Sequence, residues 1–177
     1  MKTALLVIDM QQALTDAQPA RKDEFLLNVK FLVDAAHAGG VEVVYVRHDG
    51  GADDDLAFGT PGWQLDRSLS LREGERVFDK RFSSSFRNTG LHEYLSERGV
   101  ERLVICGMQT EYCIDTSVKV AFEFGYDILI PSGATSTYDN PFLTGEKIIL
   151  FYERMIWHEP LAQVVCMQDA VFALMHP

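Results

Sequence analysis

Short, almost wholly apolar runs alternate along the chain with longer amphipathic stretches. The apolar runs lack the alternation of a half-exposed sheet, so they predict strands that are buried on both faces. These predicted strands are Ala4–Ile8, Val41–Val46, Arg76–Phe78, Arg102–Cys106, Asp127–Ile130 and Ala162–Val165. Helical periodicity lies between them, over Lys22–Ala38, Asn88–Glu97, Glu111–Phe124, Thr144–Ile156 and Asp169–Leu174. This alternation predicts a three-layer α/β/α sandwich with a mainly parallel six-stranded sheet, in a single domain over residues 1–177.

Glycines and one aperiodic stretch mark the connections between these elements. Gly39-Gly40, Gly99 and Gly125 each follow a predicted helix and precede a strand, as C-terminal helix stops do. The stretch from Arg47 to Arg72 has no clear period and is predicted to be a long loop. Loops of this length inside a compact domain are more often functional than idle.

Composition narrows the class of protein. The 177 residues are 47% hydrophobic and 24% charged, as in an ordinary soluble domain, with a net charge of −10. The acidic balance argues against a nucleic-acid partner, and the apolar runs are too short to span a membrane. Three cysteines without CxxC spacing, and a start unlike a signal peptide, lead us to expect a cytoplasmic protein with free thiols.

Reactive side chains follow three of the predicted strands. Asp9 comes directly after the first, Lys80 lies at the end of the third, and Cys113 follows the fourth. Because ligands bind beyond the carboxyl ends of parallel strands, we expect these three side chains at one edge of the sheet. A thiol beside an acid and a lysine is suited to covalent acyl transfer.

Cys113 is the candidate nucleophile. Thr110 is a plausible N-cap for the following helix, which places Cys113 in the first turn, where the helix dipole favours a thiolate. Each residue alone also has an ordinary interpretation: Cys113 as a small core residue, Asp9 as a turn residue and Lys80 as a surface lysine. Their joint placement favours the functional interpretation.

Three segments resemble the isochorismatase-like hydrolases, specifically their cysteine amidohydrolase branch. They are Ala4-Leu-Leu-Val-Ile-Asp9-Met-Gln11, Asp79-Lys80-Arg81-Phe82-Ser83-Ser84-Ser85-Phe86 and Val104-Ile-Cys-Gly107-Met-Gln-Thr110-Glu-Tyr-Cys113. The resemblance implies a catalytic triad of Asp9, Lys80 and Cys113. It also implies a cis peptide between Met108 and Gln109, with the N–H groups of Gln109 and Cys113 as the oxyanion hole.

The implied reaction is hydrolysis of a small-molecule carboxamide, ureide or lactam through a Cys113 thioester. Asp9 would take the thiol proton and return it to the departing nitrogen, while Lys80 would stabilise the Cys113 thiolate and the Asp9 carboxylate. No cofactor is expected. No metal is expected either, because the region Arg47-His48-Asp49-Gly50-Gly51 lacks the Asp-x-His pair of the family's nicotinamidases. Family members are commonly oligomers, so the resemblance also implies a homo-oligomer.

Substrate contacts are predicted at Gln11, Trp63 and Tyr112, while His48 is equally compatible with a substrate contact and with an ordinary strand end. Two alternatives stay open: a metal-dependent activity of the nicotinamidase type, and a non-catalytic binding protein on the same fold. A flavodoxin-like cofactor binder is disfavoured, because no glycine-rich phosphate loop follows the first strand.

Overall fold

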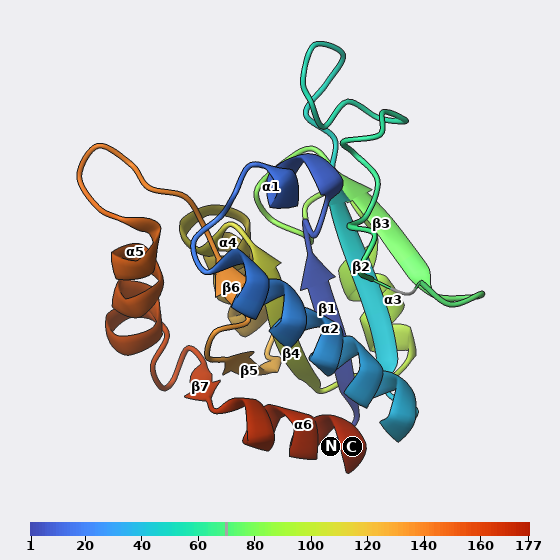
Figure 1. Ribbon diagram of the computed structural model, residues 1–177. Coiled ribbons are helices and arrows are strands. Elements are labelled where there is room, and N and C mark those ends of the chain that lie inside the picture. Colours follow the sequence, from blue (N-terminus) through green and yellow to red (C-terminus); the bar gives the residue numbers. More distant parts are fainter. Residues whose placement is uncertain (70) are drawn as a thin grey trace.

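A sheet lies between two layers of helices in the computed structural model, which describes residues 1–69 and 71–177 (Figure 1). Within these residues the sheet has seven parallel strands. Six of them occur in the order β3-β2-β1-β4-β5-β7, and the seventh, β6, pairs with the end of β4. The strands are β1 (Thr3–Ile8), β2 (Glu42–His48), β3 (Arg76–Lys80), β4 (Arg102–Met108), β5 (Asp127–Pro131), β6 (Thr135–Ser136) and β7 (Gln163–Val165). The predicted three-layer sandwich is confirmed, with β6 as one strand more than expected.

Helices cover both faces of this sheet. The described helices are α1 (Gln12–Asp16), α2 (Lys22–Gly39), α3 (Leu91–Glu97), α4 (Asp115–Glu123), α5 (Gly145–Phe151) and α6 (Met167–Met175), with π-helical turns η1 (Thr110–Ile114) and η2 (Tyr152–Ile156). Helices α2 and α6 pack on one face, and α3 and α4 pack on the other (Figure 1).

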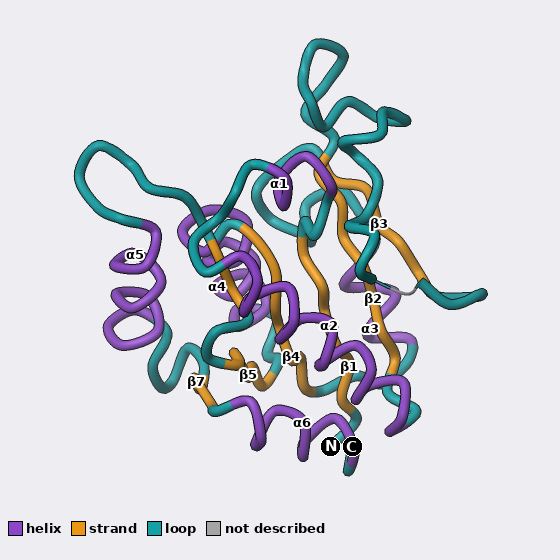
Figure 2. Tube along the Cα trace, in the orientation of Figure 1, coloured by secondary structure: helices purple, strands orange, loops and turns teal. Residues whose placement is uncertain are grey.

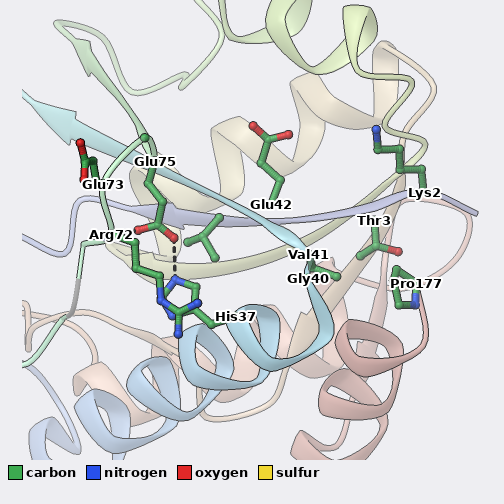
Figure 3. Close-up of a pocket in the computed structure, with 12 residues that line it drawn as sticks. Lys2, Thr3, His37, Gly40, Val41, Glu42, Arg72, Glu73, Glu75 and Pro177 are labelled. Carbon is green, nitrogen blue, oxygen red and sulfur yellow. Dashed lines mark hydrogen bonds and ion pairs between the residues drawn. The ribbon is translucent and has the colours of Figure 1, made fainter.

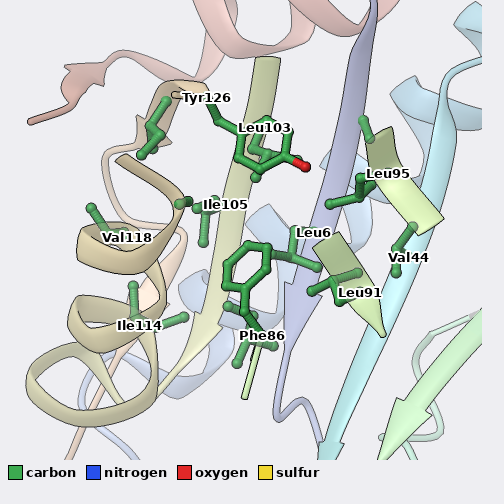
Figure 4. Close-up of a cluster of buried hydrophobic side chains, with 14 of the residues drawn as sticks. Leu6, Val44, Phe86, Leu91, Leu95, Leu103, Ile105, Ile114, Val118 and Tyr126 are labelled. Atoms are coloured by element: carbon green, nitrogen blue, oxygen red, sulfur yellow. The ribbon is translucent and has the colours of Figure 1, made fainter. Parts of the chain in front are cut away.

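Strand β1 shows why the apolar runs carry no polar alternation. Leu6 and Ile8 point into the core under α3 and α4, whereas Leu5 and Val7 point into the core under α2 and α6. Figure 4 shows Leu6 in the first of these cores, between Leu91 of α3 and residues of β4 and α4. Burial of each such side chain contributes about 1.5–3 kcal/mol, so both faces must be apolar.

Two predicted helices differ from expectation in the same way. The stretches Glu111–Phe124 and Thr144–Ile156 each combine a π-helical turn with an α-helix, η1 with α4 and α5 with η2. Thr110 is not the N-cap that the sequence suggests. Gln109 has the extended N-cap backbone and makes no side-chain cap, while the Thr110 hydroxyl hydrogen-bonds the Thr135 hydroxyl at 3.2 Å. The buried partner on β6 therefore outweighs capping.

The long connection between β2 and β3 extends beyond the carboxyl edge of the sheet (Figure 2). Its described part, residues 49–69 and 71–75, is tied back to the end of β1. Gln11 and Leu65 form an antiparallel bridge, and the Thr15 hydroxyl hydrogen-bonds Asp66 at 2.6 Å. These contacts hold the described loop against the end of β1.

A cavity of about 550 Å³ lies at the opposite edge of the sheet, where the strands begin (Figure 3). Lys2 and Thr3 line it at the start of β1, and a buried pair of His37 and Glu75 lies beside it, with 2.5 Å between Nε2 and Oε1. None of the three predicted catalytic residues lines this cavity, among the residues that the structure describes. Size alone therefore does not locate the chemistry.

Candidate active site

Asp9, Lys80 and Cys113 meet at the carboxyl edge of the sheet. Lys80 Nζ lies 2.8 Å from Asp9 Oδ2 and 3.1 Å from Cys113 Sγ. Asp9 and Lys80 are each only 1% exposed, whereas Cys113 is half-buried. The structure thus brings together the three side chains that the sequence placed after β1, at the end of β3 and after β4.

The backbone at the end of β1 directs Asp9 inward. Asp9 has a left-handed φ of +52°, which is uncommon for a residue other than glycine. Its N–H donates to Val46 O of β2 at 2.8 Å, so the turn is held by the neighbouring strand. A non-glycine residue in this region often marks a functional position, because the surrounding structure must enforce it.

Close packing of β4 against β1 places the residues before Cys113. Gly107 has a φ of +124°, and a Cβ atom there would lie 1.9 Å from Ile8 O. The peptide bond between Met108 and Gln109 is cis, as the sequence resemblance implied. Gln109 then lines the cavity in which the Cys113 thiol lies.

The charges of the site oppose one another at Cys113. Burial and the negative charge of Asp9 raise the pKa of the Cys113 thiol to about 12, despite the opposing effect of Lys80. Burial and Asp9 therefore favour the protonated thiol of Cys113, against the effect that the helix dipole would have. Burial lowers the pKa of Lys80, but the negative charge of Asp9 and the hydrogen bond to it act in the opposite direction, so the pKa is raised and the ammonium is kept.

One oxygen of Asp9 is free to accept a proton. Oδ2 pairs with Lys80, while Oδ1 is buried and has no hydrogen-bond partner among the described residues. An unsatisfied buried carboxylate oxygen is costly, and such groups persist where they have a catalytic role. A carboxylate oxygen of Asp9 lies within 4.8 Å of the Cys113 sulfur, so the acid and the thiol belong to the same small site.

The cavity at this edge has a volume of about 190 Å³. Its lining residues come from the ends of strands, from α1, from η1 and from the long loop: Asp9, Leu14, His48, Leu56, Ser83, Gln109, Tyr112 and Cys113. Tyr112 is thus on the cavity wall, as predicted, and is 58% exposed.

Gln11 and Trp63 lie elsewhere. Gln11 is fully buried, and its side-chain amide donates to His48 O and Trp63 O. Trp63 packs against Phe58 with ring centroids 4.5 Å apart, and the guanidinium of Arg47 lies 3.4 Å above its ring. Neither residue lines the cavity in the described structure. Both stabilise the loop that covers the site.

Sequence analysis missed Leu14, Leu56 and Ser83. Ser83 stands three residues after Lys80, within a segment that was singled out, so its position carried a signal. Leu14 and Leu56 carried none, because an isolated leucine in an irregular segment has the same pattern whether it faces a ligand or the core. His48, which was left open, lies on the cavity wall with Nδ1 3.3 Å from Lys80 Nζ.

Asp9, His48 and Cys113 also form a cluster whose donor atoms lie within 4.8 Å of one another, as metal ligands do. Lys80 Nζ lies 2.8 to 3.3 Å from an atom of each of the three. The lysine ammonium therefore occupies the place in this cluster that a cation would take. Binding a metal there would require Lys80 to move away from both Asp9 and Cys113.

The sheet order and the helices on both faces define an α/β fold of the isochorismatase-like hydrolases. A solved isochorismatase from Pseudomonas putida has this fold, with a TM-score of 0.89 over 95% of this chain and 89% of that chain, at 29% identity. Residues 3–144 match the isochorismatase domain, and the chain belongs to the isochorismatase family of hydrolases.

Several relatives are named for an activity. A streptothricin hydrolase from Streptomyces noursei is 35% identical over 144 residues, which cover 80% of this chain and 57% of that protein. The chain therefore spans a little over half the length of this relative. A ureidoacrylate amidohydrolase from Rhizobium rhizogenes is 27% identical over 165 residues, covering 71% of this chain and 66% of that protein.

Among the described residues, no helix is both long enough and apolar enough to cross a membrane.

Proposed function

We propose that this protein is a cysteine hydrolase that cleaves the C–N bond of a small carboxamide, ureide or lactam through a Cys113 acyl-enzyme. The observation that carries the proposal is the contact of one buried ammonium with both a buried carboxylate and a thiol, Lys80 with Asp9 and Cys113. A nucleophile, a base and a fixed cation in contact with one another are the groups that covalent acyl transfer needs.

Proton transfer within the site would start the reaction. Because the resting Cys113 is protonated, Asp9 Oδ1 accepts the thiol proton as sulfur attacks the carbonyl carbon. Lys80 remains beside both groups and offsets the negative charge as it moves from carboxylate to sulfur. The carbonyl oxygen becomes an oxyanion, for which we propose the N–H groups of Gln109 and Cys113 as donors.

Collapse of this intermediate breaks the C–N bond and leaves a thioester on Cys113. Asp9 gives its proton to the departing nitrogen, which leaves as ammonia, as an amine or, for a lactam, as an amino group of the acyl chain. Asp9 then takes a proton from water, whose oxygen attacks the thioester carbonyl. The C–S bond breaks, and the Cys113 thiolate takes the proton that Asp9 received from water, so the net reaction adds one water across the C–N bond.

The cavity supports a small substrate. Its volume of about 190 Å³ is below the roughly 300–1,000 Å³ of typical ligand pockets. The apolar side chains of Leu14 and Leu56 and the ring of Tyr112 form part of the wall, so a compact amide with an apolar part fits this lining. The ureidoacrylate amidohydrolase among the relatives supports C–N cleavage for this chain.

Ammonia and amine release from a panel of small amides, ureides and lactams tests the proposal. Wild type should turn over at least one compound, and Cys113→Ala should show no turnover while it keeps the fold. Cys166→Ser is the matched control, because Cys166 is an exposed thiol outside the site. Substantial turnover by Cys113→Ala would refute the mechanism. Loss of turnover in Cys166→Ser would contradict the assignment of the nucleophile.

A further inference from the structure

We propose that His48 is a positioning residue that keeps the Lys80 ammonium between Asp9 and Cys113, and that Gln11 holds His48 in place for this purpose. The inference rests on the proposed function, since it assigns His48 and Gln11 to the same reaction. It gives a role to a histidine that the sequence left open and to a buried glutamine that does not reach the cavity.

The side-chain amide of Gln11 hydrogen-bonds both the N–H and the carbonyl oxygen of His48. Its Oε1 accepts from His48 N at 2.7 Å, and its Nε2 donates to His48 O at 2.9 Å. The same Nε2 donates to Trp63 O at 3.0 Å, which adds the long loop to the arrangement. Because Gln11 is fully buried, this double hydrogen bond is shielded from water and fixes the end of β2.

His48 in turn completes the hydrogen bonds of Lys80. An ammonium has three N–H donors and no acceptor. Lys80 Nζ lies 2.8 Å from Asp9 Oδ2, 3.1 Å from Cys113 Sγ and 3.3 Å from His48 Nδ1, so each donor has one partner. The side chain of Lys80 is fully buried, so loss of the third partner would leave a charged N–H unsatisfied. The ammonium would then be free to shift away from the thiol.

The role requires a neutral imidazole, because Nδ1 must carry a lone pair toward the ammonium. Burial and then the positive charge of Lys80 lower the pKa of His48, and these effects outweigh the opposing charges of three carboxylates. Those carboxylates face His48 from the end of β1 (Asp9) and from the loop (Asp49 and Asp54). His48 is therefore neutral at pH 7, and its proton is on Nε2.

Two substitutions of His48 separate positioning from folding. Asn can present its side-chain oxygen near the place of Nδ1, whereas Leu fills similar space without an acceptor. We expect His48→Leu to lower kcat by about 100-fold with little change in KM, because the ammonium is misplaced. We expect His48→Asn to stay within about tenfold of wild type, because its side-chain oxygen can still accept from the ammonium. His158→Asn is the matched control, because His158 is exposed and its ring hydrogen-bonds only a neighbouring backbone oxygen in the described structure.

The pH dependence of activity and the alkylation rate of Cys113 should both change if His48 positions Lys80. Neither should change in this way if His48 has only a structural role. Wild type should lose activity in acid as His48 is protonated, and His48→Asn should keep its activity to lower pH. Iodoacetamide should alkylate Cys113 more slowly in His48→Leu than in His48→Asn at pH 8, because a misplaced Lys80 no longer lowers the pKa of the thiol. Gln11→Ala should lower kcat in the same direction as His48→Leu while it keeps the acid limb.

The outcomes distinguish this inference from the proposed function. Wild-type kcat in folded His48→Leu, or equal losses in the Leu and Asn variants, would overturn the role of His48. Turnover by Cys113→Ala would instead overturn the mechanism itself. The alkylation rates need no substrate, so equal rates in both His48 variants would refute positioning even if no compound of the panel were hydrolysed.

Discussion

Lys80 and Asp9 form a buried ion pair with 2.8 Å between Nζ and Oδ2, and neither side chain is more than 2% exposed. Such a pair is not primarily a stabilising device, since the cost of removing two charges from water offsets much of their attraction. Its presence at the end of β1 and β3, beside a thiol, is better explained by chemistry. The pair provides a carboxylate and a fixed cation together, and the two charges cancel.

Removal of Lys80 alone should therefore be more harmful to stability than removal of both charges. We expect Lys80→Met to lower the free energy of unfolding by about 3–5 kcal/mol, because Asp9 is left charged and buried without a partner. The double variant Asp9→Asn/Lys80→Met should recover a large part of this loss. Urea unfolding of the wild type, both single variants and the double variant measures the coupling.

Arg47→Met is the comparison for this cycle, because Arg47 of β2 pairs with Asp79 of β3 at a partly exposed site. Loss of the Arg47–Asp79 ion pair should lower the free energy of unfolding by about 1 kcal/mol or less. Equal costs for Lys80→Met and the double variant would contradict the coupling between Lys80 and Asp9.

Asp9 should affect the Cys113 thiol and the reaction in opposite directions. Its charge raises the pKa of the thiol, so Asp9→Asn should lower that pKa and let iodoacetamide react at lower pH than in wild type. The same variant should lose amide hydrolysis, because no base accepts the thiol proton or activates water. The pH dependence of alkylation, measured beside turnover, tests both parts. Slower alkylation of the variant at every pH would show that Asp9 activates the thiol instead.

The triad could be predicted from sequence because two simple regularities locate it. Apolar runs identify β1, β3 and β4, and parallel strands bring their carboxyl ends to one edge. Asp9 directly follows β1, Lys80 ends β3, and Cys113 lies in η1 shortly after β4, so linear position was enough to place them at one edge. The six predicted strands were found for the same reason, whereas β6 has only two residues and leaves no periodic signal.

What could not be predicted depends on contacts between distant segments. Gln11 stands two residues after Asp9, yet its side chain turns to the backbone of β2, because the loop pairs with it at Leu65. The protonation of Cys113 follows from burial and from the approach of Asp9, neither of which is encoded locally. Leu56 reaches the cavity from a loop without a period, so only the folded loop shows it.

Acidification should destabilise the fold through His48. Its pKa in the folded protein is below the ordinary value of 6.5, so the unfolded chain binds more protons between these two values. The contribution of neutral His48 to stability is therefore complete above pH 6.5 and is lost as the pH falls through the folded pKa. The midpoint of urea unfolding should fall from pH 7.5 to lower pH, and it should fall further for wild type than for His48→Asn. An equal fall in both proteins would mean that other groups account for the acid sensitivity.

The close approach of β4 to β1 makes Gly107 the backbone position on which the site depends most. Its φ of +124° disfavours any side chain, and a Cβ atom would lie 1.9 Å from Ile8 O. Since both atoms belong to central strands, Gly107→Ala should cost more than about 3 kcal/mol or prevent folding. Urea unfolding, or the yield of soluble protein where the variant does not fold, measures this cost.

Gly125→Ala separates the clash from the backbone strain. Gly125 also has a positive φ, of +86°, but a Cβ atom there meets no described atom within 4 Å. Its cost should be limited to about 1–2 kcal/mol, the penalty of a left-handed alanine. A similar small cost for Gly107→Ala would show that β1 and β4 can separate. In that case the spacing between Asp9 and Cys113 would not be fixed by this contact, and turnover of the variant should remain near that of wild type.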